Sequence, residues 1–177
     1  MLRLQIKYLS FFLGLITILS FFNIIYSYYL NLYLNLETYY LSLIFSLTLS
    51  IIFYKIKIPY KKLTIFEKIL TVFLGYILLP LVLSIPFYFS IYNLTFINSF
   101  FEAISGFTST GFTIFENIKN IDQSLILWRS STQWIGGLYF LFSIIFLIDI
   151  YDENFKKTLT NFISFDSSEI LKQASKI

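Results

Sequence analysis

The sequence contains neither cysteine nor histidine, and each absence excludes a class of chemistry. Without cysteine the chain can form no disulfide, no thiolate nucleophile and no zinc–thiolate site. Without histidine it lacks the commonest general base and the commonest metal ligand. Its carboxylates do not cluster in the sequence either. The residues therefore argue against an enzyme, and no bound cofactor is expected.

Charged residues are also scarce. They make up 13% of the 177 residues, about half of the ~25% that is typical of soluble domains. The hydrophobic fraction is 57% and the mean hydropathy is +0.75. This composition argues against a solvated globular domain and against disorder, which requires low hydrophobicity and high charge. Because a membrane-spanning helix takes ~20 apolar residues, the chain has room for about four or five spans.

Four apolar runs approach or reach the length of a span, at roughly residues 8–30, 38–54, 65–91 and 124–150. We expect the first to be a retained anchor helix, because it exceeds the ~7–15-residue core of a signal peptide and no small-residue cleavage site follows. Pro80 and Pro86 are expected to break the third run, which membrane helices tolerate where neighbours satisfy the freed carbonyls. Trp128 and Trp134 suit the aromatic belts at the membrane interfaces.

Positive charge is distributed unevenly along the chain. Of the 13 Lys and Arg residues, all but Lys119 and Arg129 lie in the N-terminal segment, in or beside the loop after the second run, or in the C-terminal tail. The positive-inside rule therefore places both termini in the cytoplasm. This requires four spans and a re-entrant segment between roughly residues 93 and 123. The net charge of +3 then reflects topology, and with no nucleic-acid motif present we expect no nucleic-acid partner.

The segment between the third and fourth runs has two parts. From Phe96 to Phe107 apolar residues recur at helical spacing, with Gly106 as a plausible stop. From Thr108 to Thr113 small polar residues surround a glycine, which suits extended backbone with exposed carbonyls. In potassium channels a strand of this kind follows a short pore helix, and its carbonyls replace the water shell of the ion. On composition alone, a plain external loop stays open as the alternative.

Two motifs in this region resemble a known family. The stretch Phe101-Glu102-Ala103-Ile104-Ser105-Gly106-Phe107-Thr108-Ser109-Thr110-Gly111 is similar to the first pore loop of the TrkH/KtrB potassium-uptake proteins. The stretch Trp128-Arg129-Ser130-Ser131-Thr132-Gln133-Trp134-Ile135-Gly136-Gly137 is similar to the start of the helix that follows that loop. The two motifs have the order and separation of that family, and the Leu79-Pro80 pair before them is similar as well. The resemblance is weakest over the first two runs.

The resemblance implies an all-α membrane protein with four spans and one re-entrant loop. Residues 1–57 would form an N-terminal transmembrane hairpin, residues 58–150 one helix–pore-loop–helix repeat of the potassium-channel type, and residues 151–177 the start of a cytoplasmic linker. It also implies a multi-pass location in the bacterial plasma (inner) membrane, with both termini in the cytoplasm. The implied function is transmembrane transport of potassium.

The resemblance also implies which residues bind the transported ion. The selectivity filter of this repeat would consist of Thr108, Ser109, Thr110, Gly111 and Phe112. Their backbone carbonyls would coordinate K⁺, which is then cargo and not a cofactor. Gly111 matches the filter glycine of the family, where small size and a positive φ matter.

Other residues are expected to support the pore helix. Charged groups at membrane depth are costly and tend to pair, so we expect Glu102 and Arg129 to interact and brace the pore helix against the last helix. The alternative is that each reaches the outer interface separately. Gly106, Gly136 and Gly137 are expected to allow close packing around the filter.

One filter strand cannot enclose an ion, so the resemblance implies three further pore repeats, from a continuing chain or from partner chains. We expect the chain to be a fragment or one piece of a split transporter. Its partners would be the lipid bilayer, those repeats and a cytoplasmic nucleotide-binding regulatory subunit of the kind this family uses. A homotetrameric cation channel stays open, as does a non-conducting membrane protein that is an assembly or regulatory subunit or a degenerate remnant. A secondary transporter is disfavoured because we find no inverted repeat.

Overall fold

The computed structural model describes residues 6–56, 64–116 and 121–147. Every regular element in these residues is a helix: α1 (Ile6–Tyr29), α2 (Leu36–Lys55), α3 (Ile65–Leu83), α4 (Ile85–Tyr88), α5 (Phe96–Phe107) and α6 (Gln123–Leu147). The expected all-helical fold is confirmed. The expected linker at 151–177 and Lys119 lie outside the described residues.

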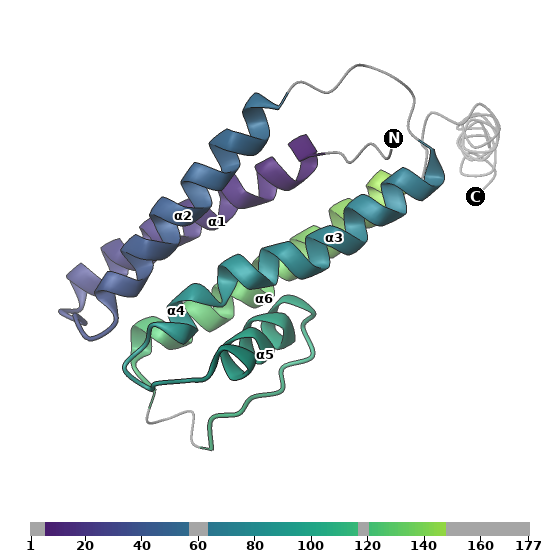
Figure 1. Ribbon diagram of the computed structural model, residues 1–177. Helices are drawn as coiled ribbons and strands as arrows, with labels where there is room; N and C mark the ends of the chain where they lie inside the picture. Colours follow the sequence, from purple (N-terminus) through teal and green to yellow (C-terminus); the bar gives the residue numbers. More distant parts are fainter. Residues whose placement is uncertain (1–5, 57–63, 117–120, 148–177) are drawn as a thin grey trace, which may run out of the picture. The chain divides into compact units, whose positions relative to one another are not determined.

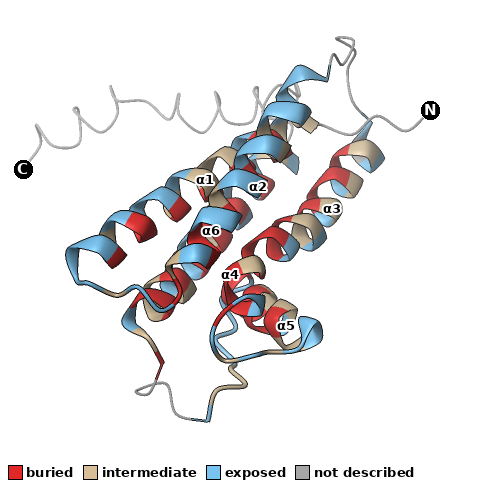
Figure 2. Ribbon diagram, turned by 60° about the vertical axis from the view of Figure 1, so that its left-hand side comes forward, coloured by how far each residue is buried: buried red, intermediate tan, exposed pale blue. Residues whose placement is uncertain are grey.

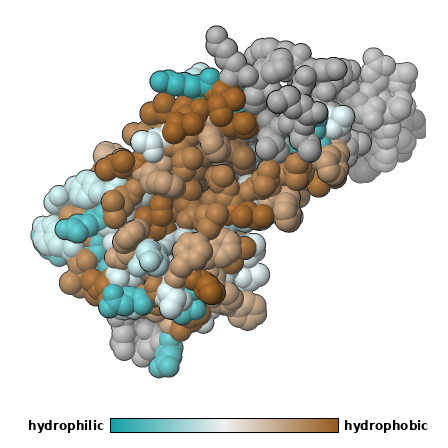
Figure 3. Space-filling model, in the orientation of Figure 1, coloured by the Kyte–Doolittle hydropathy of each residue, from teal (hydrophilic) through white to brown (hydrophobic). Residues whose placement is uncertain are grey.

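Within the residues that the structure describes, four stretches are long and apolar enough to cross a membrane, as the charge and hydropathy patterns predict. They are Ile6–Tyr29, Leu36–Lys55, Phe66–Tyr88 and Gln123–Leu147. Figure 3 shows hydrophobic side chains over most of the visible face of these helices. The chain divides into two compact units, Met1–Ser143 and Ile144–Ile177, and the first contains the helix core and the loop after α5.

Helices α1 and α2 lie side by side and form a hairpin (Figures 1 and 2). Hydroxyl side chains bond across their interface at three levels. The hydroxyls of Ser10 and Ser50 each donate to the other residue's backbone carbonyl at 2.9 Å. The hydroxyls of Thr17 and Ser46, and of Ser20 and Ser42, bond to each other at 2.9 and 3.1 Å. Small hydroxyl residues let two helices approach closely and bond to each other where lipid supplies no hydrophobic driving force. This seam explains how two apolar helices find one register.

The core around α6 is centred on Tyr139, which is fully buried. Its ring contacts four aromatic rings from α1, α3 and α5, with centroids 4.8–5.6 Å away: Tyr8, Phe12, Tyr76 and Phe107. Its hydroxyl donates a hydrogen bond to the carbonyl of Val72 in α3, at 2.9 Å. Gly75 makes room for this contact, because a Cβ at that position would overlap the tyrosine hydroxyl. Tyr139 thus joins α6 to three other helices.

The third span is interrupted beside Pro86, one of the two prolines at which the sequence predicts a break, and not at Pro80. The expected break at Pro80 is wrong: that residue lies inside α3, and the helix continues to Leu83. The interruption falls at Ser84, just before Pro86 at the start of α4. The carbonyl of Leu83 accepts a hydrogen bond of 3.1 Å from the indole nitrogen of Trp128 in α6. A neighbouring helix therefore satisfies a carbonyl at the break.

Trp128 is consequently not a belt residue, which corrects the expectation from the sequence. Its side chain is fully buried, and its N–H is used at the helix break. Trp134 is 59% exposed, as an interfacial or lipid-facing residue should be.

The hairpin is tied to the segments on either side of α5 by Asn35, a buried residue in the turn between α1 and α2. Its amide nitrogen donates to the carboxylate of Asp122, just before α6, at 2.9 Å. Its amide oxygen accepts from the backbone N–H of Ile91, just after α4, at 3.1 Å. One side chain therefore bonds to both ends of the segment that contains α5.

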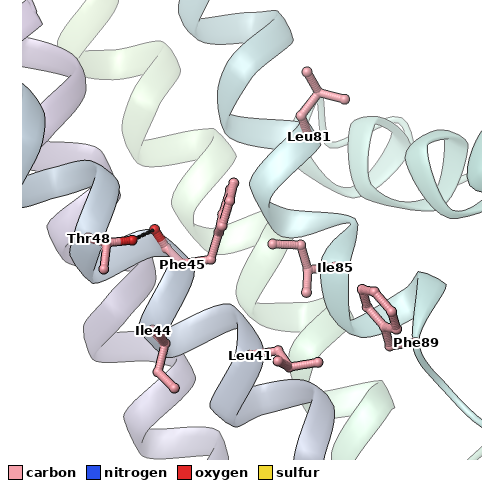
Figure 4. A pocket seen from close by; sticks show the side chains of 7 residues that line it. All are labelled: Leu41, Ile44, Phe45, Thr48, Leu81, Ile85 and Phe89. Atoms are coloured by element: carbon pink, nitrogen blue, oxygen red, sulfur yellow. Dashed lines mark hydrogen bonds between the residues drawn. The ribbon is translucent and has the colours of Figure 1, made fainter.

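An apolar groove lies between α2 and the α3–α4 span (Figure 4). Its lining residues are Leu41, Ile44, Phe45, Thr48, Leu81, Ile85 and Phe89. The hydroxyl of Thr48 donates to the carbonyl of Phe45 within its own helix. The groove thus presents hydrocarbon, which suits a surface at membrane depth.

Replacing Trp128 by Phe tests the helix break. The change leaves the Leu83 carbonyl without its indole donor, and a buried unsatisfied polar group costs about 1–3 kcal/mol. We expect a lower midpoint of thermal unfolding in detergent micelles. Trp134→Phe is the matched control, because it makes the same chemical change at an exposed position, where effects stay within about 0.5 kcal/mol. Equal midpoints for the two variants would contradict the assigned role of the indole N–H.

Candidate functional site

The helix expected between Phe96 and Phe107 is present as α5 with the same bounds. The side chain of Thr95 caps its first turn by accepting a hydrogen bond from the N–H of Asn98, at 3.3 Å. Its buried face includes Glu102 and Ser105, one helical turn apart, and it packs against α3 and α4. The helix is short, with one face turned to its neighbours and one face left open (Figure 2).

The C-terminal end of α5 rests directly on α6. A Cβ on Gly136 would overlap the carbonyl of Phe107, and a Cβ on Gly106 would overlap the hydroxyl of Thr132. At Gly136 the contact is therefore backbone against backbone, and at Gly106 the backbone of α5 lies against the side chain of Thr132. Both close approaches depend on the missing Cβ. No atom lies within 4 Å of a Cβ built on Gly137, so the structure brings Gly106 and Gly136 into this seat and leaves Gly137 outside it.

The residues after α5 turn back so that their amides point at the end of the helix. The N–H groups of Thr108, Ser109, Thr110 and Gly111 donate to carbonyls of Ile104, Ser105 and Gly106, at 2.8–3.4 Å. The last carbonyls of a helix have no partner within the helix, and here the following chain supplies the donors. Four consecutive donors are consumed in this way.

The carbonyls of the same segment face the other way. Among the described residues, no donor reaches the carbonyl oxygens of Thr108, Ser109 or Thr110. Residues 108–112 are all exposed in the structure. Two of them have left-handed backbone, Ser109 with φ 57° and Gly111 with φ 78°. A positive φ is unusual for serine, and such strain is found at functional sites.

Ser105 organises this turn, a role that the sequence did not reveal. Its hydroxyl donates to the carbonyl of Phe112 at 2.7 Å and lies 3.1 Å from the hydroxyl of Thr110. Its carbonyl accepts from the amides of Thr110 and Gly111. Its place one turn after Glu102, on the same face of a short helix, was the available signal.

Glu102 and Arg129 lie together, as the sequence suggests. The carboxylate is fully buried and the arginine side chain is 12% exposed, with Nε 3.4 Å from Oε2. That contact is an ion pair without hydrogen-bond alignment, because neither atom has a hydrogen-bond partner in the described residues. The pair joins α5 to α6.

Both members of the pair also bind the loop. The other carboxylate oxygen, Oε1, accepts from the hydroxyl of Thr113 at 2.7 Å and from the N–H of Ile114 at 2.6 Å. The guanidinium Nη2 donates to the carbonyls of Gly111 and Phe112, both at 3.1 Å. Thr113 is a further contact that the sequence did not reveal, because nothing in its spacing marks it as a partner of Glu102.

The chemistry of the exposed segment is that of an acceptor. Its amide donors are turned inward, and the free groups are neutral carbonyl oxygens, which suit a cation such as K⁺. The nearby C-terminus of α5 adds a partial negative charge. No group of three or more acidic side chains that could hold a metal ion occurs in the described part of the chain. A weakly held monovalent cation fits this arrangement better than a tightly chelated metal.

Gly136→Ala tests the seat of α5. The added methyl group would displace the Phe107 carbonyl, and overpacking costs about 1–3 kcal/mol. Gly137→Ala makes the same change one residue on, where the Cβ meets nothing, and so shares any gain in helix propensity of about 1 kcal/mol. We expect Gly136→Ala to unfold at a lower temperature than Gly137→Ala in detergent. The reverse order would contradict the backbone contact.

The chain is similar to several transport proteins. It is 29% identical over 127 residues to an uncharacterized cation transporter of Methanocaldococcus jannaschii, which covers 71% of this chain and 27% of that protein. It is 42% identical over 60 residues to the Trk system potassium uptake protein TrkI of Halomonas elongata, which covers 34% of this chain and 11% of that protein. It is 37% identical over 73 residues to TrkH of Escherichia coli, which covers 41% of this chain and 15% of that protein.

No family model and no solved structure matches the chain. The chain spans 27% or less of the length of these three relatives. They are named for cation transport or potassium uptake, so the resemblance of the chain to the Trk-type proteins is confirmed at the level of sequence similarity. The chain is a helical membrane protein related in sequence to the Trk-type potassium-uptake proteins.

Proposed function

We propose that the chain takes part in potassium transport across a bacterial plasma membrane, supplying one of four selectivity-filter loops of a Trk-type pore. The observation that carries this proposal is the direction in which the amide and carbonyl groups of residues 108–111 point. Their amides bond to the end of α5, and the carbonyls of Thr108, Ser109 and Thr110 have no donor among the described residues. A dehydrated K⁺ requires oxygen ligands of this kind.

The membrane setting supports the same function. Irregular backbone at membrane depth is tolerated only where it is buried in protein or lines a water-filled cavity. In the proposed topology residues 1–57 form the hairpin, residues 58–150 the pore repeat and residues 151–177 the start of a linker, with both termini in the cytoplasm. Helix α5 and its loop then enter and leave the membrane from the outer side as a re-entrant loop. The carbonyls of Thr108–Thr110 would line the pore that this loop helps to form.

A complete pore requires three more filter strands, because one strand contacts an ion from one side only. We infer that these come from a continuing chain or from partner chains, which agrees with the small share of the Trk relatives that the chain spans. A non-conducting assembly or regulatory role is the second candidate. The exposed apolar surface favours neither, since both require contact with lipid or with other helices.

Rescue of a bacterium that lacks its own potassium-uptake systems tests the proposal. The full chain is expressed alone, and also as a chimaera in which it replaces the N-terminal hairpin and first repeat of Escherichia coli TrkH. We expect growth at low potassium with the chimaera and none with the chain alone. Rescue by the chain alone would favour a homotetramer. A chimaera that reaches the membrane but takes up no potassium would favour the non-conducting role.

Gly111→Ser in the transporting chimaera tests the filter assignment. A side chain at a φ of 78° is strained by about 1–2 kcal/mol, enough for roughly a tenfold effect. We expect the preference for potassium over sodium to fall by about that factor, as measured by competition in ⁸⁶Rb⁺ uptake. Gly14→Ser is the matched control, because a Cβ there makes only an ordinary contact with Ser50. An unchanged preference in Gly111→Ser would remove Gly111 from the filter.

A further inference from the structure

The five residues of the proposed filter strand are not equivalent in the structure. The carbonyls of Thr108, Ser109 and Thr110 have no donor among the described residues, whereas those of Gly111 and Phe112 do. Arg129 Nη2 donates to both of the latter, and the hydroxyl of Ser105 donates to Phe112 as well. The carbonyl oxygens are therefore without a described donor up to Thr110 and hydrogen-bonded from Gly111 onward.

We propose that Arg129 is a positioning residue that withdraws the carbonyls of Gly111 and Phe112 from the ion, so that this repeat presents only the carbonyls of Thr108, Ser109 and Thr110. This inference rests on the proposed function of the loop. It narrows the expected ligand set from five carbonyls to three.

The geometry of the ion pair explains why Arg129 is held in this position. Its Nε lies 3.4 Å from the buried carboxylate of Glu102, which fixes the guanidinium beside α5. Its Nη2 is then free to reach the loop, and the planar fork of arginine serves both directions at once. A charge-assisted hydrogen bond to a carbonyl is stronger than a neutral one, so the ion competes for these two oxygens at a disadvantage.

Glu102, the other member of the ion pair, also binds the loop. Its Oε1 accepts from Thr113 and Ile114, the two residues that follow Phe112. The pair therefore holds four consecutive residues, 111 to 114, by their carbonyls on one side and by a hydroxyl and an amide on the other. Within the described residues, the segment before it, 108–110, is held only through its amides and through threonine hydroxyls bonded to α5. The residues held by the ion pair begin at Gly111, directly after Thr110, the last residue whose carbonyl is proposed as an ion ligand.

Solid-state NMR of the full chain in lipid bilayers tests whether Arg129 hydrogen-bonds to the Gly111 carbonyl. This measurement does not depend on transport. Thr110–Gly111 is the one Thr–Gly pair in the sequence, and Gly106–Phe107 and Gly111–Phe112 are the two Gly–Phe pairs. Carbonyl-¹³C threonine with ¹⁵N glycine therefore reports on the Thr110 carbonyl alone. Carbonyl-¹³C glycine with ¹⁵N phenylalanine reports on the carbonyls of Gly106 and Gly111.

The comparison that isolates Arg129 is Glu102→Gln against the double variant Glu102→Gln/Arg129→Met. Both lack the carboxylate charge, and only the second lacks the guanidinium. We expect the Gly111 carbonyl signal to move upfield in the double variant, because it loses its hydrogen-bond donor, while the Thr110 and Gly106 signals stay in place. If the double variant is not recovered from membranes, Arg129→Lys keeps the charge and replaces the fork by one ammonium. It should give a smaller shift in the same direction.

Whether this hydrogen bonding affects ion selectivity is tested in the transporting chimaera, by its preference for potassium over sodium. Arg129→Lys should lower this preference roughly tenfold, because two carbonyls are released toward the ion. Ser130→Ala is the control on the same helix, since that hydroxyl bonds only to its own helix at Ile126 among the described residues. A stable Arg129→Lys chimaera with unchanged preference would overturn the inference.

The outcomes separate the two proposals. An unmoved Gly111 signal in the double variant would overturn the role of Arg129 whatever the chimaera does. A parent chimaera that carries no potassium would overturn the proposed function, and the ligand assignment with it. A moved Gly111 signal together with a lowered preference in Arg129→Lys supports both.

Discussion

The last carbonyls of a helix have no partner within the helix and need donors from elsewhere, and this constraint shapes the region around α5. No further helical turn follows Phe107, so the donors come from the chain that turns back, namely the amides of residues 108–111. Once those amides point inward, the carbonyls of Thr108–Thr110 must point outward. The acceptor surface is thus a consequence of how α5 is terminated, and Ser109 adopts a positive φ to make the turn. The same backbone conformation therefore satisfies the end of α5 and exposes the carbonyls of the proposed ion site.

Carbonyl oxygens can coordinate an ion selectively only if their positions are fixed. The packing of α5 against α6 fixes the end of α5 in this structure. Gly136 lets the end of α5 approach the backbone of α6, and Tyr139 on the next turn of α6 ties the same region to α1 and α3. A buried ion pair such as Glu102–Arg129 recovers its desolvation cost only when its remaining donors and acceptors are used. Here Oε1 of Glu102 and Nη2 of Arg129 are used on the loop itself, whereas Oε2 and Nε have no hydrogen-bond partner among the described residues. The pair therefore fixes the position of residues 111–114 more than it adds to stability.

Much of this arrangement is encoded locally and could be predicted. The bounds of α5 follow from apolar spacing, and the closeness of Glu102 and Arg129 follows from the cost of isolated charge in a membrane. The two expectations that proved wrong, at Pro80 and Trp128, depend on how neighbouring helices meet the third span. Whether Pro80 breaks a helix depends on how its neighbours satisfy the freed carbonyls, and Trp128 is buried because the break after Leu83 offers it an acceptor. Periodicity and composition describe one segment at a time and do not contain such pairings.

The α1–α2 hairpin closes the loop that carries the proposed site. Asn35 bonds to Ile91 at the start of that excursion and to Asp122 at its end. Bringing the ends of a segment this long together costs chain entropy, which grows slowly with its length. A buried amide that uses its donor on one end and its acceptor on the other offsets part of that cost. It also sets where α6 begins relative to α4, and the position of α6 in turn determines where Arg129 meets the loop.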